Sequence, residues 1–147
     1  MKPAILLFLL LCTAFAHGQE IPKNAGIIVI KSIGFDEAMS KLIDSSHYEV
    51  KKLNKDNMYV RTKFKKACDD CITAVSISLR VVDSVAYING KWTTKGGFLS
   101  GLKDKIDDEE FVYDIKNEKG RPAKEAFKAM LTFALSLNRE LSYKIIE

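Results

Sequence analysis

The sequence predicts an α+β domain in which an antiparallel sheet of about five strands carries two helices on one face. Three observations lead to this fold class. Residues 27–30 form a β-branched run with the composition of a buried strand. Segments between residues 58 and 94 alternate apolar and polar side chains, as half-buried strands do. Residues 35–45 and 122–138 instead repeat their apolar side chains at helical spacing.

Residues 27–45 predict a strand and then a helix, with Gly34 between them. Asp36 and Glu37 occupy the first turn of this helix, where carboxylates interact favourably with the positive end of the helix dipole. The helix is expected to end at residues 45–47. Its apolar positions are Phe35, Met39, Leu42 and Ile43.

Four strands are expected next, over residues 48–53, 58–66, 72–82 and 85–94. Turn-forming residues separate the first two strands at 54–57 and the last two at 83–84. The pair Asn89-Gly90 is a hairpin signal in its own right, so it predicts either a split in the last strand or a bulge. A meander of this kind has one apolar face, which the two helices would cover.

The C-terminal part begins with an irregular stretch, residues 95–120, that predicts a loop and a short edge strand at 111–115. Pro122 suits the first turn of a helix, and the apolar stripe after it predicts a helix that ends near Asn138. Residues 141–145 alternate again, which favours an extended tail.

The expected order over residues 27–138 is therefore strand, helix, four strands and helix. In this order the chain resembles one half-repeat of the TATA-box-binding protein, where a curved sheet is backed by two helices. It is also similar to small exported bacterial envelope domains of unknown function that share this topology. The resemblance lies in element order and carries over no functional residue.

Residues 1–18 predict a cleaved export signal, which leaves residues 19–147 as a single domain. Lys2 precedes an apolar run that is shorter than the about 20 residues needed to span a bilayer. Cleavage is expected before Gln19 or, alternatively, before His17, and it leaves 22 basic and 19 acidic residues. The sequence therefore indicates a periplasmic or extracellular protein.

Cys12 offers a different interpretation of the same segment. A bacterial lipoprotein signal places a lipidated cysteine directly after a short apolar stretch, and Cys12 stands in such a position. The residue before the lipidated cysteine is normally small, whereas Leu11 is large, and the small residues at Ala14 and Ala16 form a competing cleavage site. A lipid anchor is therefore the minority interpretation.

Cys68 and Cys71 are the two cysteines that remain after cleavage, and they flank two aspartates between predicted strands. Paired cysteines in exported proteins are usually oxidised. A disulfide that closes so short a loop stabilises the fold by about 2 kcal/mol in the chain-entropy description. We predict a structural disulfide at the tip of a hairpin.

A redox function of the same pair is the alternative. A thioredoxin-like CxxC motif begins a helix, whose dipole stabilises the thiolate, whereas the residues after Cys71 predict a strand. Asp69 and Asp70 would also disfavour a thiolate. A zinc site would need about two further ligands, and the sequence has neither a second CxxC motif nor a histidine pair. No metal or cofactor is expected.

Basic residues gather on the polar side of the predicted strands. A solvated sheet face that resists aggregation is the simpler interpretation. Basic residues around an aromatic ring favour nucleic acid in other settings, but an exported protein seldom meets it. A protein or an anionic envelope component, such as an acidic glycan or a lipid headgroup, is the expected partner. The possible binding face comprises Tyr59, Arg61, Lys63, Lys65 and Arg80.

Two other features carry weaker signals. His47 is suited in principle to general base catalysis, but a single histidine at the end of a helix is more often a surface residue. The acidic residues 107–110 lack the spacing of an EF-hand loop. With no nucleophile motif or cofactor fingerprint, the sequence favours a non-enzymatic binding or structural module. A redox protein using Cys68 and Cys71 and a secreted inhibitor using residues 95–101 are the alternatives.

Overall fold

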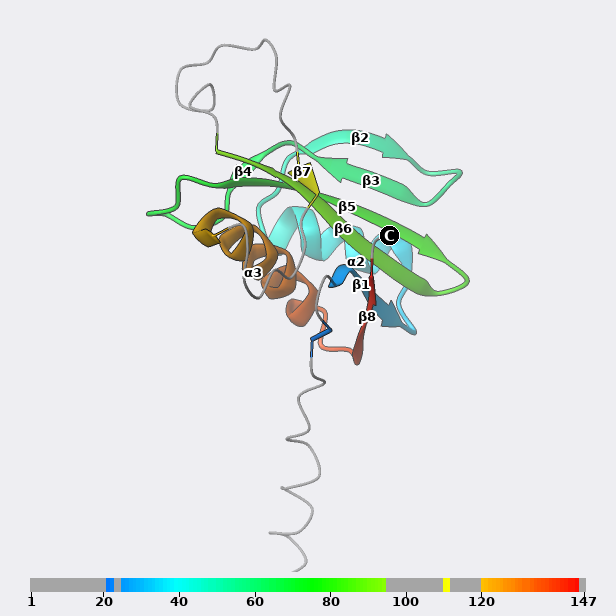
Figure 1. Cartoon of the computed structure of the whole chain (residues 1–147). Helices are drawn as coiled ribbons and strands as arrows, with labels where there is room; N and C mark the ends of the chain where they lie inside the picture. The colour runs from blue at the N-terminus through cyan, green and yellow to red at the C-terminus, as the bar shows by residue number, and fades with distance from the viewer. Residues whose placement is uncertain (1–20, 23–24, 95–109, 112–119, 146–147) are drawn as a thin grey trace, which may run out of the picture.

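The computed structural model describes residues 21–22, 25–94, 110–111 and 120–145. In this part of the chain, eight strands form one antiparallel sheet, and the helices lie on one side of it (Figure 1). The predicted α+β class is confirmed, whereas the sheet is larger than the five strands expected. The predicted export signal, the loop at 95–101 and the acidic residues 107–109 lie outside the described residues.

The six longer strands lie side by side in the order β2-β3-β5-β6-β1-β8, so β2 and β8 form the two edges. The extra strands arise because the predicted segment 58–66 divides in two, and because residues 110–111 and 141–145 also pair. The strands are β1 (Ala25–Lys31), β2 (Val50–Asn54), β3 (Tyr59–Thr62), β4 (Lys65–Lys66), β5 (Ala74–Val82), β6 (Val85–Thr93), β7 (Glu110–Phe111) and β8 (Leu141–Ile145).

The two predicted helices are both present. α2 (Phe35–Ser40) continues directly into a π-helical turn, η1 (Lys41–Ser45), and the second helix is α3 (Gly120–Ser136). After η1 the chain reverses through His47, whose φ of 54° lies in the left-handed region. The N–H of Tyr48 then donates to the carbonyl of Leu42 at 3.2 Å, which satisfies a carbonyl that the helix end leaves open.

The hairpin between β5 and β6 turns at Asp83 and Ser84. Their φ values of 51° and 60° are those of a two-residue turn with both central residues left-handed, which matches the twist of the strands. The expectation of a turn or bulge at Asn89-Gly90 is wrong. β6 pairs with β5 residue by residue from Val85 to Thr93. The chain has already reversed at the earlier turn, so the later signal is overridden by the long strand pairing.

The core lies between the sheet and the helices. Alternate residues of β1, β5 and β6 point into it, where they meet the apolar sides of α2, η1 and α3. The largest side chains that are fully buried there include Ile28, Ile30, Leu42, Ile77, Leu79, Ile88, Met130 and Phe133. The described helices do not cover the opposite face of the sheet, and we call it the open face.

A bulge separates β3 from β4. Arg61 pairs with Ser78 and Lys65 pairs with Val75, so three residues on one strand face two on the other. The hydroxyl of Thr62 accepts a hydrogen bond of 2.9 Å from the N–H of Ile77, which would otherwise lack a partner at this point. One extra residue exchanges the faces of all side chains that follow it.

Candidate functional site

The open face carries aromatic and basic side chains in cross-strand register. Tyr59, Arg80 and Tyr87 are direct neighbours on β3, β5 and β6. Because adjacent strands lie about 4.8 Å apart, the backbones of the two tyrosines are about 10 Å apart, with Arg80 midway between them. The register therefore places Arg80 between two tyrosines on one surface.

A shallow pocket of about 550 Å³ lies over this row of residues. A second hollow of about 270 Å³ adjoins it, shares Tyr59 and Arg80, and adds Lys52, Asn54 and Asn57. None of these lining residues is acidic. We call the first of the two the open-face pocket, and it is lined by Ile27, Tyr59, Ser78, Arg80, Val82, Tyr87 and Asn89.

Hydrogen bonds hold part of this surface in place. The Tyr59 hydroxyl donates to the hydroxyl of Ser78 at 3.4 Å. On the same side, Nε of Arg61 donates at 3.4 Å to the buried hydroxyl of Ser76. Nζ of Lys144, from β8, lies 4.9 Å from the centroid of the Tyr87 ring, a favourable cation–π distance. The pocket therefore has polar groups with defined positions and positive charge at its edge.

Of the five residues that the sequence assigned to a binding face, the structure places Tyr59, Arg61 and Arg80 together on the open face. Lys63 lies at the bulge and forms an ion pair of 2.7 Å with Glu49. The hydrogen bond and the charge of Lys63 lower the pKa of the Glu49 carboxyl. The charge of Lys63 is therefore matched by a neighbour at the strand edge.

Lys65 lies on the helix side of the sheet, so the prediction that it lies beside Arg61 on the open face is wrong. The bulge after β3 adds one residue and so turns Lys65 to the other face. Its Nζ donates to the carbonyl of Ser46 at 2.7 Å and lies 5.0 Å from the centroid of the Tyr48 ring. Burial raises the pKa of the Tyr48 hydroxyl to about 12.

Of the seven residues that line the open-face pocket, the predicted binding face included only Tyr59 and Arg80. Tyr87 and Asn89 alternate with the buried Ala86 and Ile88, and this pattern was enough to place them on the polar face. Lys144 gave no comparable signal, because its position depends on β8 pairing with the distant β1.

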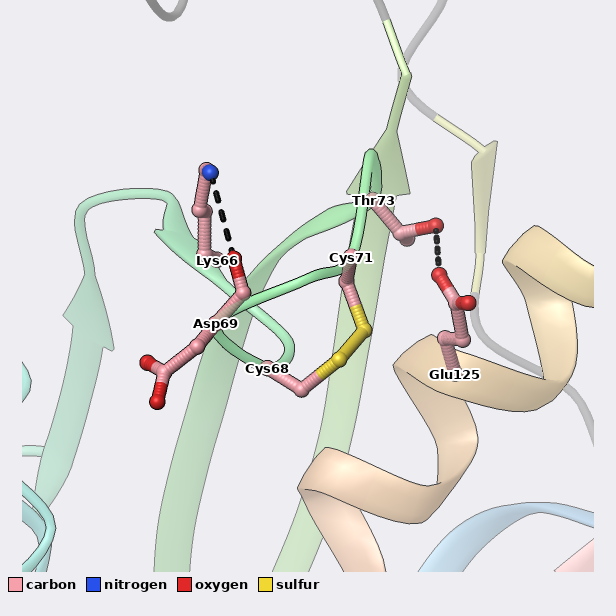
Figure 2. The surroundings of a disulfide bond; sticks show 6 residues. All are labelled: Lys66, Cys68, Asp69, Cys71, Thr73 and Glu125. Carbon is pink, nitrogen blue, oxygen red and sulfur yellow. Dashed lines mark hydrogen bonds between the residues drawn. A yellow bond between two sulfur atoms is a disulfide. The ribbon is translucent and has the colours of Figure 1, made fainter.

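The second candidate site is the disulfide hairpin (Figure 2). The predicted disulfide between Cys68 and Cys71 is confirmed, with Cα atoms 5.0 Å apart. The N–H of Cys71 donates to the carbonyl of Cys68 at 3.1 Å, and that of Ala67 donates to the carbonyl of Thr73 at 2.9 Å. The bond thus closes the connection between β4 and β5, and we call residues 67–72 the hairpin tip.

A cleft of about 720 Å³ lies between the hairpin tip, η1 and α3. Tyr48 and Phe133 contribute aromatic surface to its lining, and Lys66, Glu125 and Lys128 contribute charges of both signs. The Thr73 hydroxyl donates to Oε2 of Glu125 at 2.8 Å and joins the hairpin to α3 (Figure 2). Charges of both signs give this cleft no clear preference for an anion or a cation.

The surroundings of the two sulfur atoms differ from those of a thioredoxin-like site. Cys68 is exposed and Cys71 is buried, but the chain continues from Cys71 into β5 and not into a helix. Stabilisation of a thiolate by a helix N-terminus is therefore missing at this pair. His47 is exposed at the end of η1.

Comparison with known proteins found no matching family model, no curated protein and no solved structure of significant similarity. Over the described ranges, no helix has the length and apolar character to cross a bilayer. The same ranges bring together no group of three or more potential metal-ligating side chains of His, Cys, Asp or Glu. Within the described residues, the open face and the disulfide hairpin are therefore the two candidate functional sites.

Proposed function

We propose that the protein is an exported, non-enzymatic binding module that takes an acidic glycan of the cell envelope on its open face. One observation carries this proposal. Arg80 stands between Tyr59 and Tyr87 in a pocket that no acidic side chain lines. A guanidinium with aromatic neighbours is well suited to bind a carboxylate that is attached to a flat or ring-shaped ligand.

The remaining lining residues favour a sugar over a simple anion. Tyrosine rings offer flat apolar surface for the faces of sugar rings, with a hydroxyl at the edge. Ser78 and Asn89 provide hydroxyl and amide groups that pair with sugar hydroxyls. The two hollows extend from β1 to β2, about 19 Å across four strand spacings, which suits a chain of sugar units.

Export to the cell envelope, and kinship with envelope domains of TATA-box-binding-protein-like topology, are parts of this proposal. The order of elements from β1 to α3 supports the topology. The disulfide is consistent with an exported protein, since such bonds persist mainly in oxidising compartments. That setting favours an envelope polymer over a nucleic acid.

The proposal is tested by calorimetric titration with polygalacturonate, a linear polymer of uronic acids. The protein is purified as the expression host processes it, and dextran serves as the neutral polymer. We expect binding to polygalacturonate that weakens at least about tenfold in Arg80→Met, because a charge-assisted contact is lost. Lys128→Met, which removes an exposed cation from α3, is the matched control and should bind as the parent does.

Three results would each overturn the glycan proposal. They are undetectable binding, an equal loss of affinity in Lys128→Met and Arg80→Met, and tighter binding of a single-stranded oligonucleotide at the same ionic strength. The last result would identify the open face as a nucleic-acid surface.

A thiol-disulfide function is the second candidate, and the exposed Cys68 beside the buried Cys71 is the observation that favours it. Thiol-disulfide exchange needs access to only one of the two sulfur atoms, so one exposed cysteine is sufficient. Equilibration with glutathione gives the reduction potential. A value below about −300 mV, typical of structural disulfides, would exclude this function.

A further inference from the structure

The hairpin tip is held rigidly although it lies at the end of the sheet. The disulfide closes it, and the hydrogen bond from Thr73 to Glu125 fixes its base to α3. Nζ of Lys66 also donates to the carbonyl of Asp69 at 3.4 Å (Figure 2). A segment ordered in advance loses little conformational entropy when it binds a partner.

This rigid tip exposes acidic and apolar side chains together. Asp69 and Asp70 are exposed, and Figure 2 shows the carboxylate of Asp69 turned away from Lys66. Ile72 is 73% exposed, the highest value among the large apolar residues in the described part of the chain. A single exposed isoleucine is ordinary on a protein surface. The combination of Ile72 with two carboxylates on an ordered tip is what suits a specific contact.

The open-face pocket has the complementary chemistry. Ile27 and Val82 provide apolar surface in its lining, and Arg80 provides a positive charge. Lys144 adds a second cation over the ring of Tyr87. An acidic and apolar tip therefore matches this pocket in both charge and hydrophobic character.

The tip and the pocket lie at opposite ends of the sheet. Ile72 precedes β5, whereas Arg80 and Val82 stand near its far end, beside the turn to β6 (Figure 1). The strand from Ala74 to Arg80 alone covers about 20 Å, and Ile72 lies two residues before it. Because β5 is paired on both sides, a chain cannot bring its own tip to its own pocket.

We propose that the protein associates head to tail, with the hairpin tip of one copy seated in the open-face pocket of the next. In this contact Asp69 and Asp70 pair with Arg80, and Ile72 packs against the apolar part of the pocket. The two contacting surfaces differ, so association adds copies in one direction and produces open chains or closed rings. This inference rests on the proposed function in using the same pocket, so an acidic glycan and the tip compete for it.

Sedimentation velocity of the host-processed protein, from about 1 µM to about 1 mM, tests the assembly in the range of weak to moderate contacts. We expect a sedimentation coefficient that rises with concentration and falls when an excess of a galacturonic acid trimer, too short to hold two copies, is added. Ile72→Ser should raise the dissociation constant at least about tenfold, as truncation of a central apolar contact does. Leu135→Ser, which truncates another exposed apolar side chain, on α3 (56% exposed), should leave association unchanged.

Charge reversal gives a sharper test. Asp69→Lys with Asp70→Lys, and separately Arg80→Glu, should each yield a monomer, whereas an equimolar mixture should associate again, because opposite charges then meet at every contact. A parent protein that stays monomeric up to about 1 mM, or a mixture that fails to associate, would overturn the assembly. Ile72→Ser changes the tip and not the pocket, so it should still bind polygalacturonate. Binding of polygalacturonate without association would contradict the assembly alone, and association without such binding would contradict the glycan proposal alone.

Discussion

The hydroxyl of Thr73 donates a 2.8 Å hydrogen bond to the carboxylate of Glu125 and ties the disulfide hairpin to α3. Thr73 is fully buried, and Glu125 reaches it from 52 positions further along the chain. The bond anchors the base of the hairpin tip to the helix, because Thr73 directly precedes β5.

Replacement of Thr73 by Val should lower the free energy of unfolding by about 1–2 kcal/mol, since a partly buried hydrogen bond to a carboxylate is lost. Valine keeps the branched shape of threonine, so packing changes little. Urea denaturation measures the effect. Thr132→Val is the control, because the Thr132 hydroxyl is exposed and donates only to its own helix. A loss of equal size in both variants would contradict the special role of the Thr73 bond.

Removal of the disulfide should destabilise the fold and leave ligand binding at the distant pocket unchanged. We expect Cys68→Ser with Cys71→Ser to lower the free energy of unfolding by about 2 kcal/mol, the chain-entropy value for a loop this short. Thermal unfolding measures the change, and a reductant should lower the melting temperature of the parent protein but not of the variant. Loss of polygalacturonate binding in the variant would show that the hairpin contributes to the glycan site.

Tyr48 should make the protein less stable in alkali. Burial raises the pKa of its hydroxyl from 10.0 in the unfolded chain to about 12, so the folded state holds its proton more tightly. The tighter proton binding contributes to the free energy of unfolding. This contribution is complete below pH 10 and is lost as the pH rises towards 12, with a slope of at most about 1.4 kcal/mol per pH unit.

Tyr48→Phe removes this ionisation and tests the prediction. Its free energy of unfolding should depend less on pH between 10 and 12 than that of the parent, as measured by urea denaturation across this range. Tyr87→Phe is the matched control, because Tyr87 is only half-buried, at the open-face pocket. The prediction fails if the two variants show the same alkaline slope.

Glu49 should regain an ordinary pKa when its partner is removed. The hydrogen bond and positive charge of Lys63 lower the pKa of this exposed carboxyl, and Lys63→Met abolishes both. An NMR titration of the Glu49 side chain should therefore show a higher midpoint in the variant. High salt should raise the midpoint of the parent, because exposed charges are screened. Lys66→Met, an exposed lysine that pairs elsewhere, should leave the midpoint unchanged.

The elements of this fold were largely predictable because most of them are defined by local patterns. The helical spacing from Phe35 to Ser45 and the alternation from Ala74 to Val82 each reflect which side chains are buried along one element. The signal at Asn89-Gly90 failed because turn propensity is weak compared with nine consecutive pairs between β5 and β6. A local turn preference is overridden when long-range strand pairing forms more backbone hydrogen bonds.

The candidate site was less predictable than the fold. The alternation of side chains correctly predicted that Tyr59, Arg61 and Arg80 share one face, but it wrongly predicted the same face for Lys65. The bulge at residues 62–64 depends on how β3 and β4 meet β5, and the residues of a single strand do not reveal it. Lys144 joins the open face because β8 pairs with β1.

The α+β class, both helices and the disulfide between Cys68 and Cys71 could be predicted from the sequence, because periodicity and close spacing are local properties of a chain. Which side chains share a surface depends on the tertiary structure. It set Arg80 between Tyr59 and Tyr87, moved Lys65 to the helix side, and put the hairpin tip and the open-face pocket at opposite ends of β5. The physical reason is that strand order, register and bulges arise from hydrogen bonds between distant segments.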